Sequence, residues 1–366
     1  MEMKKMNKNI IVLPGDGIGP EVSREAIKVL KSIEKKYGHE FMIEEHLLGG
    51  SAIEVCGTPL PKETWSACLN AEAIFVGAVG GPKWDNMPVE LRPEQGFKKI
   101  RLGLHLYANL RPIKLYSGLE HLSPLKNEIA LKGIDIMIVR ELTGGIYFGK
   151  KSRIDTTNRG EMTTDLMSYT EYEIERIGRR AFELAMKRRK ILTSIDKENV
   201  LECSRLWRKV MHKLSMEYPS VQYNDLYVDN AAMQLIKAPY MFDVLVTENM
   251  FGDILSDEAS VLAGSIGLLP SASFNESKIA LYEPVHGSAP DIAGENKANP
   301  IAAILSVALM LRHSFGLFTE ANDIEDSVEN VLSRGIHTSD LPGSIPSIGT
   351  KEMGDAICCD LENKNQ

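Results

Sequence analysis

Asp253 and Asp257, two acids four residues apart, are the side chains of this sequence best suited to chemistry. They lie in the stretch 249–257, which follows an apolar run at 242–246 and leads into a helical pattern at 258–262. Residues four apart share one face of a helix, so both carboxylates would point to the same place. Such a pair costs a helix about 0.2–0.5 kcal/mol unless something lies between the charges. Hard cations such as Mg²⁺ or Mn²⁺ take oxygen ligands. The pair indicates either a divalent metal site or a solvated helix face, and the apolar residues interleaved with the acids favour the metal.

Three arginines form a second group of candidates. Arg111 and Arg140 each close an apolar run, and Arg101 lies in a basic segment. Arginine suits the recognition of carboxylates, because its rigid fork matches two oxygens. Each residue taken singly is either a carboxylate-binding group or an ordinary surface arginine.

Lys197 and Asp229 follow two expected strands, at 190–194 and 223–228. Ligands of open α/β sheets gather at the carboxyl ends of strands. A lysine in that position acts as a base when its neighbours shift its pKa, although most lysines are simply solvated.

Two glycine-bearing loops complete the set. The segment 14–20 joins the first expected strand to the first expected helix, but it lacks the GxGxxG spacing of a common dinucleotide-binding turn. The loop 283–294 contains Asp291, an acid of the kind that hydrogen-bonds both hydroxyls of a cofactor ribose. The alternative for this loop is a capped connection before a helix.

Composition limits the class of protein. The 366 residues are 43% hydrophobic and 25% charged, which is ordinary for a globular protein of two domains or of one large α/β unit. The net charge of −8 argues against nucleic acid as the main partner. The five cysteines show no CxxC pair, which argues against a disulfide framework or structural zinc. Neither a secretory signal nor a membrane-spanning run is recognisable, so we expect a soluble cytoplasmic protein with no membrane partner.

Short apolar runs alternate with helical patterns, which predicts an α/β fold. Strands are expected at 10–13, 73–76, 134–139, 190–194, 223–228 and 242–246. Helices are expected at 20–33, 171–187, 204–216, 231–237, 251–263, 300–314 and 324–332. The glycine- and proline-rich stretch 77–93 is expected to be a long functional loop.

Taken together, the motifs of this chain resemble those of the β-decarboxylating dehydrogenases, the family that contains the isocitrate and isopropylmalate dehydrogenases. The resemblance runs from Gly15 to about Gly349, and its motifs stand at 80–85, 108–112, 139–149, 249–257 and 286–294.

The resemblance implies a two-domain, three-layer α/β/α fold that is not a Rossmann fold. Residues 1–106 and 265–366 would form an NAD-binding domain. Residues 107–264 would form a second domain with the dimer interface and the metal-site aspartates. An arm at 150–167 would tie the homodimer together.

The resemblance also implies roles for the candidates. Arg101, Arg111 and Arg140 would bind the two carboxylates of a malate. Asp253 and Asp257 would hold Mg²⁺ or Mn²⁺ with Asp229 from the other subunit, and Asp229 would also contact the substrate. Lys197, also lent across the interface, would be the base at the substrate hydroxyl. Tyr147 would be the acid that protonates carbon after CO₂ leaves.

The cofactor implied is NAD⁺. Its binding residues would be Gly81, Glu94, His286, Gly287, Ser288, Ala289, Asp291, Ile292 and Asn299. Asp291 and Ile292 stand where NADP-using relatives carry a Lys-Tyr pair. A carboxylate there would repel a 2′-phosphate and accept hydrogen bonds from the ribose, which favours NAD⁺.

The activity implied is the oxidative decarboxylation of (2R,3S)-3-isopropylmalate to 4-methyl-2-oxopentanoate, in leucine biosynthesis. Isocitrate dehydrogenases carry Ser and Asn at the positions of Gln95 and Phe97, so Phe97 favours an apolar substrate side chain. The chain departs from the usual pattern at Phe97 and Lys98, where two leucines are normal, and at Glu198, where alanine is common.

Two alternatives stay open. The first is a sister dehydrogenase that acts on another 3-substituted malate, on homoisocitrate or on tartrate. The second is a catalytically silent metal- and nucleotide-binding subunit. The presence of all the expected catalytic side chains argues against a silent subunit.

Overall fold

The computed structural model describes residues 6–116, 118–154, 160–277, 279–341 and 346–363, and its chain divides into two compact units. Unit 1 consists of Met1–Leu106, Leu115–Pro124 and Ala263–Gln366, and unit 2 of Tyr107–Lys114 and Leu125–Leu262. Within the described ranges, every helix is too short or too polar to cross a membrane.

Unit 1 contains five strands in the order β2-β1-β3-β12-β11. Their bounds are β1 (Asn7–Gly15), β2 (Glu40–Glu45), β3 (Ala73–Ala78), β11 (Pro270–Phe274) and β12 (Ala280–Pro284). β1 runs parallel to β2 and β3, β3 runs parallel to β12, and β11 pairs antiparallel with β12. Every residue of β3 is buried, as expected for a strand covered on both faces.

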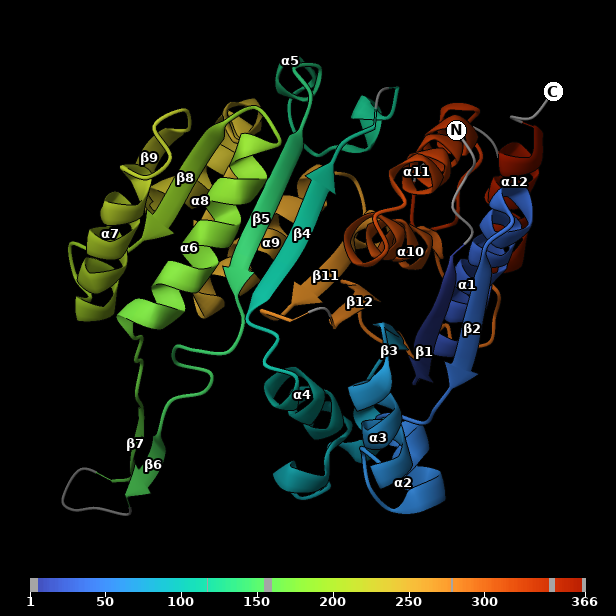
Figure 1. Cartoon of the computed structure of the whole chain (residues 1–366), viewed down its shortest axis with the longest axis horizontal. Coiled ribbons are helices and arrows are strands. Elements are labelled where there is room, and N and C mark those ends of the chain that lie inside the picture. The colour runs from blue at the N-terminus through green and yellow to red at the C-terminus, as the bar shows by residue number, and fades with distance from the viewer. Residues whose placement is uncertain (1–5, 117, 155–159, 278, 342–345, 364–366) are drawn as a thin grey trace. The chain divides into compact units, whose positions relative to one another are not determined.

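The helices of unit 1 are shown in Figure 1. They are α1 (Gly19–Tyr37), α2 (Gly50–Cys56), α3 (Lys62–Asn70), α4 (Pro93–Gly103), α10 (Ile301–Ser314), α11 (Phe318–Ser333) and α12 (Thr350–Asn363). Helices α1 and α10 pack on β3 and on each other. Four single-turn 3₁₀ helices complete the unit: η1 (Pro82–Trp84), η2 (Val89–Leu91), η3 (Glu120–Leu122) and η5 (Ile266–Leu268). The apolar core includes Ile11, Leu13, Ile74, Val76 and Leu281. Fully burying such a side chain contributes about 1.5–3 kcal/mol.

Unit 2 contains the strand order β4-β5-β10-β8-β9. The bounds are β4 (Ala108–Lys114), β5 (Asp135–Glu141), β8 (Ile191–Asp196), β9 (Gln222–Tyr227) and β10 (Val244–Thr247). β4 and β5 are antiparallel, and the remaining neighbours are parallel. The carboxyl ends of β5, β10, β8 and β9 therefore meet at one edge of this sheet.

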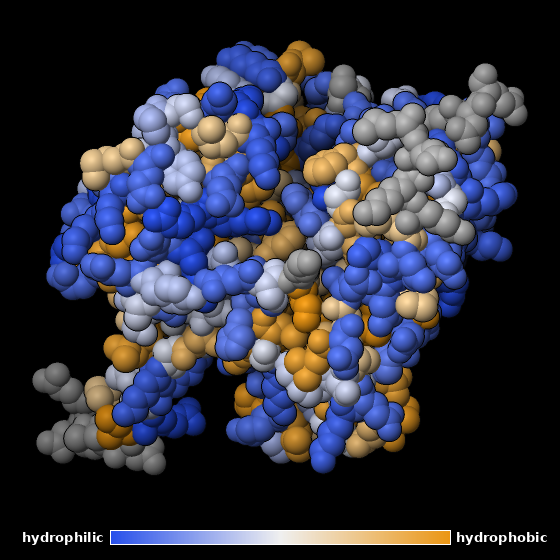
Figure 2. Space-filling view, viewed as in Figure 1, coloured by the Kyte–Doolittle hydropathy of each residue, from blue (hydrophilic) through white to orange (hydrophobic). Residues whose placement is uncertain are grey.

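The helices of unit 2 cover both faces of its sheet (Figure 1). They are α5 (Asn127–Ala130), α6 (Glu171–Met186), α7 (Glu202–Ser215), α8 (Val228–Lys237) and α9 (Asn249–Leu262), with the 3₁₀ turn η4 (Pro239–Met241). Thr170 begins α6 with a reciprocal capping box to Glu173, which satisfies two backbone donors. The buried face of α6 is apolar, whereas Figure 2 shows mainly hydrophilic residues on the surface over α6 and α7.

The predicted α/β class is confirmed, because strands and helices alternate through both units. The predicted division at residues 106 and 264 placed 115–124 in the middle domain, whereas this segment clusters with unit 1. Leu115, Tyr116, Leu119 and Leu122 of this segment are buried, and a Cβ on Gly264 would lie 2.8 Å from Leu122 Cβ. The assignment of an NAD-binding domain and of a dimer interface stays a prediction.

The predicted arm at 150–167 contains a two-stranded antiparallel sheet of β6 (Lys151–Ile154) and β7 (Met162–Asp165). Residues 155–159 of that arm lie outside the described residues.

Candidate active site

Two buried arginines lie on neighbouring strands of unit 2 and face the acids of α9. Arg111 is on β4 and Arg140 is on β5, and Arg140 stands beside Thr247 at the end of β10. Because α9 begins two residues after Thr247, its first turns pass next to Arg140. The sheet register thus places the cations against Asp253 and Asp257.

The guanidinium groups pair with both acids. Arg140 Nη1 contacts Asp253 Oδ1, and Arg111 Nη2 lies 3.8 Å from the same oxygen. Arg111 Nη1 donates to Asp257 Oδ1 at 3.2 Å. Arg111 also donates to two neutral oxygens, from Nε to Asn109 Oδ1 at 2.9 Å and from Nη1 to Ser256 Oγ at 2.6 Å. The prediction from spacing alone did not contain these pairings.

The two aspartates fit part of a divalent-metal site. Their side chains are 35% and 62% exposed, so a cation has access to both, and carboxylate oxygens are the ligands that Mg²⁺ and Mn²⁺ prefer. Among the described residues of this single chain, no three His, Cys, Asp or Glu side chains cluster as a metal site. If a cation binds here, the pair would supply two ligands, and any further ligands would come from outside this cluster.

Lys197 and Asp229 form a separate pair in unit 2. Lys197 follows β8 directly, and its Nζ donates to Asp229 Oδ1 at 2.8 Å. Asp229 is not at a strand end as predicted, because Tyr227 is the extended N-cap of α8 and Asp229 lies in that helix's first turn. The hydrogen bond from Lys197 lowers the pKa of the Asp229 carboxyl. Parallel pairing of Asp196 with Tyr227 brings the two residues together.

Glu198, which had no explanation from sequence, faces Arg208 of α7 and Tyr227. Its Oε2 lies 3.5 Å from Arg208 Nη1 and accepts from Tyr227 Oη at 3.4 Å. The Tyr227 ring is 6.0 Å from Lys197 Nζ and 4.9 Å from the Arg208 guanidinium. The departure from alanine therefore adds an anion to the surroundings of Lys197.

Tyr147 reaches the aspartate and arginine cluster from the loop after β5. Its hydroxyl donates to Asp253 Oδ2 at 3.1 Å. Burial and the neighbouring Asp253 carboxylate raise the pKa of Tyr147 above its usual value of 10. The phenol thus keeps its proton at neutral pH, as a general acid requires.

Arg101 and Phe97 lie in unit 1, one turn apart on α4. Arg101 Nη2 donates to Glu283 Oε1 at 2.8 Å, and its guanidinium lies 4.1 Å from the Phe97 ring centroid. Arg101 Nε is buried without a hydrogen-bond partner. Lys98, beside them, is half-buried.

The turn 14–20 and the loop after β12 contact each other in unit 1. Ile18 N donates to Ser288 O at 2.7 Å. Gly17 has a φ of +56°, and a Cβ there would lie 2.0 Å from Ser288 O, so only glycine fits. The strand-to-helix turn is thus a support for the predicted cofactor loop.

Asp16 is a buried acid that sequence reasoning did not single out. Its carboxylate accepts backbone N–H groups from Gly50, Ser51 and Gly80 at 2.7–2.8 Å. Burial raises its pKa, and the three amides oppose that effect. Asp16 therefore joins its own turn to two other segments, the start of α2 and Gly80, and Gly80 directly precedes the predicted contact Gly81. The only sequence signal was an acid between two glycines at a strand end.

Several predicted cofactor residues lie on the loop 286–292, and their surroundings suit a polar ligand. His286 Nε2 is buried and has no hydrogen-bond partner, and burial lowers the pKa of this imidazole. A Cβ added at Gly287 would meet no atom within 4 Å, so the backbone there is open to close approach. Asp291 is exposed. An orphaned buried nitrogen beside open backbone fits the binding of a nucleotide.

The other predicted cofactor residues have structural contacts. Asn299 Oδ1 accepts from Ile301 N at 3.0 Å, at the start of α10, and its Nδ2 donates to Asp340. A Cβ on Gly80 would lie 2.5 Å from Glu94 Oε1, so Glu94 lies against the segment that contains Gly81. Ser288 is buried, and Ala289 has an unusual φ of +34°. Ile292 N donates to Ala289 O at 3.2 Å, which closes the loop on itself.

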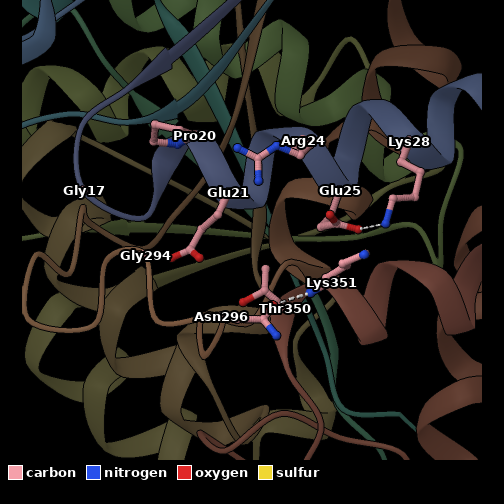
Figure 3. Close-up of a pocket in the computed structure, with 10 residues that line it drawn as sticks. All are labelled: Gly17, Pro20, Glu21, Arg24, Glu25, Lys28, Gly294, Asn296, Thr350 and Lys351. Atoms are coloured by element: carbon pink, nitrogen blue, oxygen red, sulfur yellow. Dashed lines mark hydrogen bonds and ion pairs between the residues drawn. The ribbon is translucent and has the colours of Figure 1, made fainter.

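A pocket of about 500 Å³ lies beside Gly294 and Asn296, just after the loop 286–292 (Figure 3). It is lined by Gly17, Pro20, Glu21, Arg24, Glu25, Lys28, Gly294, Asn296, Thr350 and Lys351. Lys28 forms an ion pair with Glu25 and a second one with Asp355, at 2.8 Å in the latter case. The positive charge of Lys28 in this pocket is therefore compensated. The pocket shares Gly17 with the supporting turn but contains none of the predicted cofactor contacts.

Comparisons with known proteins give a consistent result. The family model of isocitrate/isopropylmalate dehydrogenase matches residues 9–357. The chain is 55% identical to a 3-isopropylmalate dehydrogenase of Priestia megaterium, over 98% of this chain and 97% of that protein. It is 54% identical to one of Bacillus subtilis, over 98% and 99%. Among solved structures, an isocitrate dehydrogenase from Methylococcus capsulatus has a TM-score of 0.85 at 35% identity, covering 97% of this chain and 99% of that one.

Proposed function

Because the chain belongs to the isocitrate/isopropylmalate dehydrogenase family, we propose that it oxidises and decarboxylates (2R,3S)-3-isopropylmalate to 4-methyl-2-oxopentanoate. NAD⁺ is the hydride acceptor, and the reaction belongs to leucine biosynthesis. The observation that carries this proposal is the 53–57% identity to 3-isopropylmalate dehydrogenases over nearly the whole chain. The cluster of Arg111, Arg140, Tyr147 and Asp253 supports it, because these groups suit an acidic substrate that must be deprotonated and then protonated.

In this proposal the chain's own residues divide the work. Arg101, Arg111 and Arg140 bind the two carboxylates and orient the malate. Lys197 takes the proton of the C2 hydroxyl as hydride leaves C2, and Tyr147 gives a proton to C3 after CO₂ departs. When bound, a divalent cation supplies Lewis acidity at the C2 oxygen and stabilises the charge that decarboxylation leaves.

Asp253 and Asp257 would hold that cation, and we propose Mg²⁺ or Mn²⁺ for it. The protein acts as a cytoplasmic homodimer. The third carboxylate is Asp229 of the partner subunit, and the partner subunit also contributes Lys197. This proposal is supported by the exposure of the Lys197–Asp229 pair, whose side chains are 26% and 64% exposed and open to a second chain.

Kinetics of the purified protein test the function. With Mg²⁺ and NAD⁺ present, NADH formation is measured with 3-isopropylmalate, isocitrate, malate and tartrate. We expect the highest kcat/KM with 3-isopropylmalate. The aromatic ring of Phe97 against Arg101 favours, as the second candidate, a malate with another side chain. A higher kcat/KM for isocitrate or tartrate would overturn the first proposal.

Cofactor preference provides a separate prediction. Asp291 is exposed on the loop 286–292, where its carboxylate would repel a 2′-phosphate and accept hydrogen bonds from a ribose. We expect kcat/KM for NAD⁺ to exceed that for NADP⁺, and Asp291→Ser to narrow the ratio by about tenfold, the equivalent of about 1.4 kcal/mol. Glu295→Ser, a change of another exposed acid on the same connection, is the matched control. A wild-type preference for NADP⁺ would contradict the assignment.

Removal of the Tyr147 hydroxyl should separate oxidation from product formation. Tyr147→Phe keeps the ring but loses the hydrogen bond to Asp253 and the proton for carbon. We expect overall turnover to fall about 10²- to 10⁴-fold, the usual range for a general acid. NAD⁺ affinity, measured by fluorescence titration, should be unchanged. Tyr172→Phe, a change of an exposed tyrosine, is the control, and normal turnover of Tyr147→Phe would remove Tyr147 from the mechanism.

A further inference from the structure

Asn249 and Gly252, which precede the two aspartates in the same motif, both contact Arg140. We propose that they are positioning residues that hold the Arg140 guanidinium ready for a substrate carboxylate. This inference rests on the proposed function, in which Arg140 binds the malate.

The neutral side-chain oxygen of Asn249 accepts two hydrogen bonds from one edge of the Arg140 guanidinium. Asn249 is fully buried at the start of α9, and its Oδ1 accepts from Arg140 Nε at 3.1 Å and from Nη2 at 2.8 Å. The Nη1 corner of the guanidinium contacts Asp253. Asn249 therefore fixes the plane of the fork and directs its other side toward the cluster.

Asn249 is itself held at its other polar groups. Its Nδ2 donates to Gly144 O at 3.1 Å, and its backbone N–H donates to Tyr169 Oη at 3.0 Å. The Tyr169 hydroxyl in turn donates to the buried Glu248 at 3.3 Å. A side chain with this many partners has one orientation, which makes it a rigid support for Arg140.

Gly252 makes room for the stem of the same arginine. A Cβ at this position would lie 2.7 Å from Arg140 Cγ and 2.9 Å from Arg140 Cβ. These atoms are close to the backbone of β5, so the arginine could not avoid the methyl group by a change at its tip. Alanine is the better helix former, and the passage of Arg140 explains why position 252 of α9 is glycine instead.

The neutrality of the acceptor has a functional consequence. A carboxylate at position 249 would make the same two hydrogen bonds but would cancel the positive charge that attracts the substrate. The amide holds the fork without adding a second anion to the one on Asp253. The carboxylate that Arg140 does contact belongs to Asp253, one of the two proposed cation ligands.

The experiment compares three variants of the full-length enzyme loaded with Mg²⁺ and NAD⁺. For Asn249→Ala and Gly252→Ala, we expect KM for 3-isopropylmalate to rise about 10- to 100-fold, the range for loss of hydrogen bonds to a charged group. Asn249→Asp should also raise KM, although it keeps an oxygen acceptor. The dissociation constant of NAD⁺ should stay within about twofold, and kcat should fall less than kcat/KM.

Thr247→Val is the matched control, because it removes a buried hydrogen bond to Ile195 O of 2.8 Å only two residues from Asn249. It should lower Tm and leave KM unchanged. A wild-type KM in Asn249→Ala or Gly252→Ala would overturn the proposal, and so would an equal rise in KM in Thr247→Val. If the wild-type enzyme prefers another diacid, the proposed function fails, and the same comparison made with that diacid still decides the role of Asn249.

Discussion

Replacement of Lys197 by alanine should lower kcat with 3-isopropylmalate by about 10²- to 10⁴-fold, the usual contribution of a positioned general base. The ammonium lies 2.8 Å from Asp229 and within 6.0 Å of the Tyr227 ring, next to an anion at Glu198. Lys197 is the residue that directly follows Asp196, the last residue of β8, and the described segment between β8 and α7 contains no second lysine. The measurement is steady-state kinetics together with the dissociation constant of NAD⁺, which should be unchanged.

Two further variants distinguish the chemistry of Lys197 from its charge. Lys197→Arg keeps a cation beside Asp229, but a guanidinium is not deprotonated in proteins, so turnover should be lost to a similar extent. Lys209→Ala removes a surface lysine that pairs with Glu171 at 3.1 Å and should behave like the wild type. Wild-type turnover in Lys197→Ala would exclude Lys197 as the base.

The α/β class and most strands of the parallel sheets could be predicted, because their apolar runs agree with their final burial. The expected strand at 73–76 lies within the fully buried β3, and the one expected at 242–246 overlaps the fully buried β10 at 244–246. Strand β4 was harder to recognise, because Asn109, Arg111 and Pro112 interrupt its apolar pattern. It is a strand because its backbone pairs with β5 over seven residue pairs. Long-range pairing of that kind leaves no local signal in the sequence.

The candidate site shows the same limit. Spacing placed Asp253 and Asp257 on one helical face, because periodicity within a helix is local. Their pairing with Arg111 and Arg140 depends on the register of β4, β5 and β10, which brings residues more than 100 positions apart into contact. Asp16 and Asn249 were overlooked for a related reason. Each acts through hydrogen bonds to distant segments.

The ion pairs around Asp253 predict that metal and substrate bind cooperatively. Asp253 contacts Arg140 and Tyr147 and lies 3.8 Å from Arg111, while Asp257 pairs with Arg111 at 3.2 Å. If these arginines bind the substrate as proposed, its carboxylates and the aspartates would compete for the same guanidinium groups. A cation bound to the aspartates would release the arginines for the substrate.

We therefore expect the dissociation constant of 3-isopropylmalate, measured by calorimetry without NAD⁺, to fall about 5- to 150-fold when Mg²⁺ is added. Linkage requires Mg²⁺ to bind more tightly by the same factor when the substrate is present. Excess chelator should abolish turnover, and restored Mg²⁺ or Mn²⁺ should return it.

Asp253→Asn tests the origin of this coupling. Without the carboxylate, Arg140 has less anionic competition, so substrate binding in the absence of metal should strengthen while its response to Mg²⁺ largely disappears. Asp355→Asn, which removes a surface acid paired with Lys28 at 2.8 Å, should keep the full response. Equal substrate affinity with and without Mg²⁺ in the wild-type enzyme would show that the arginine–aspartate pairs do not couple the two ligands.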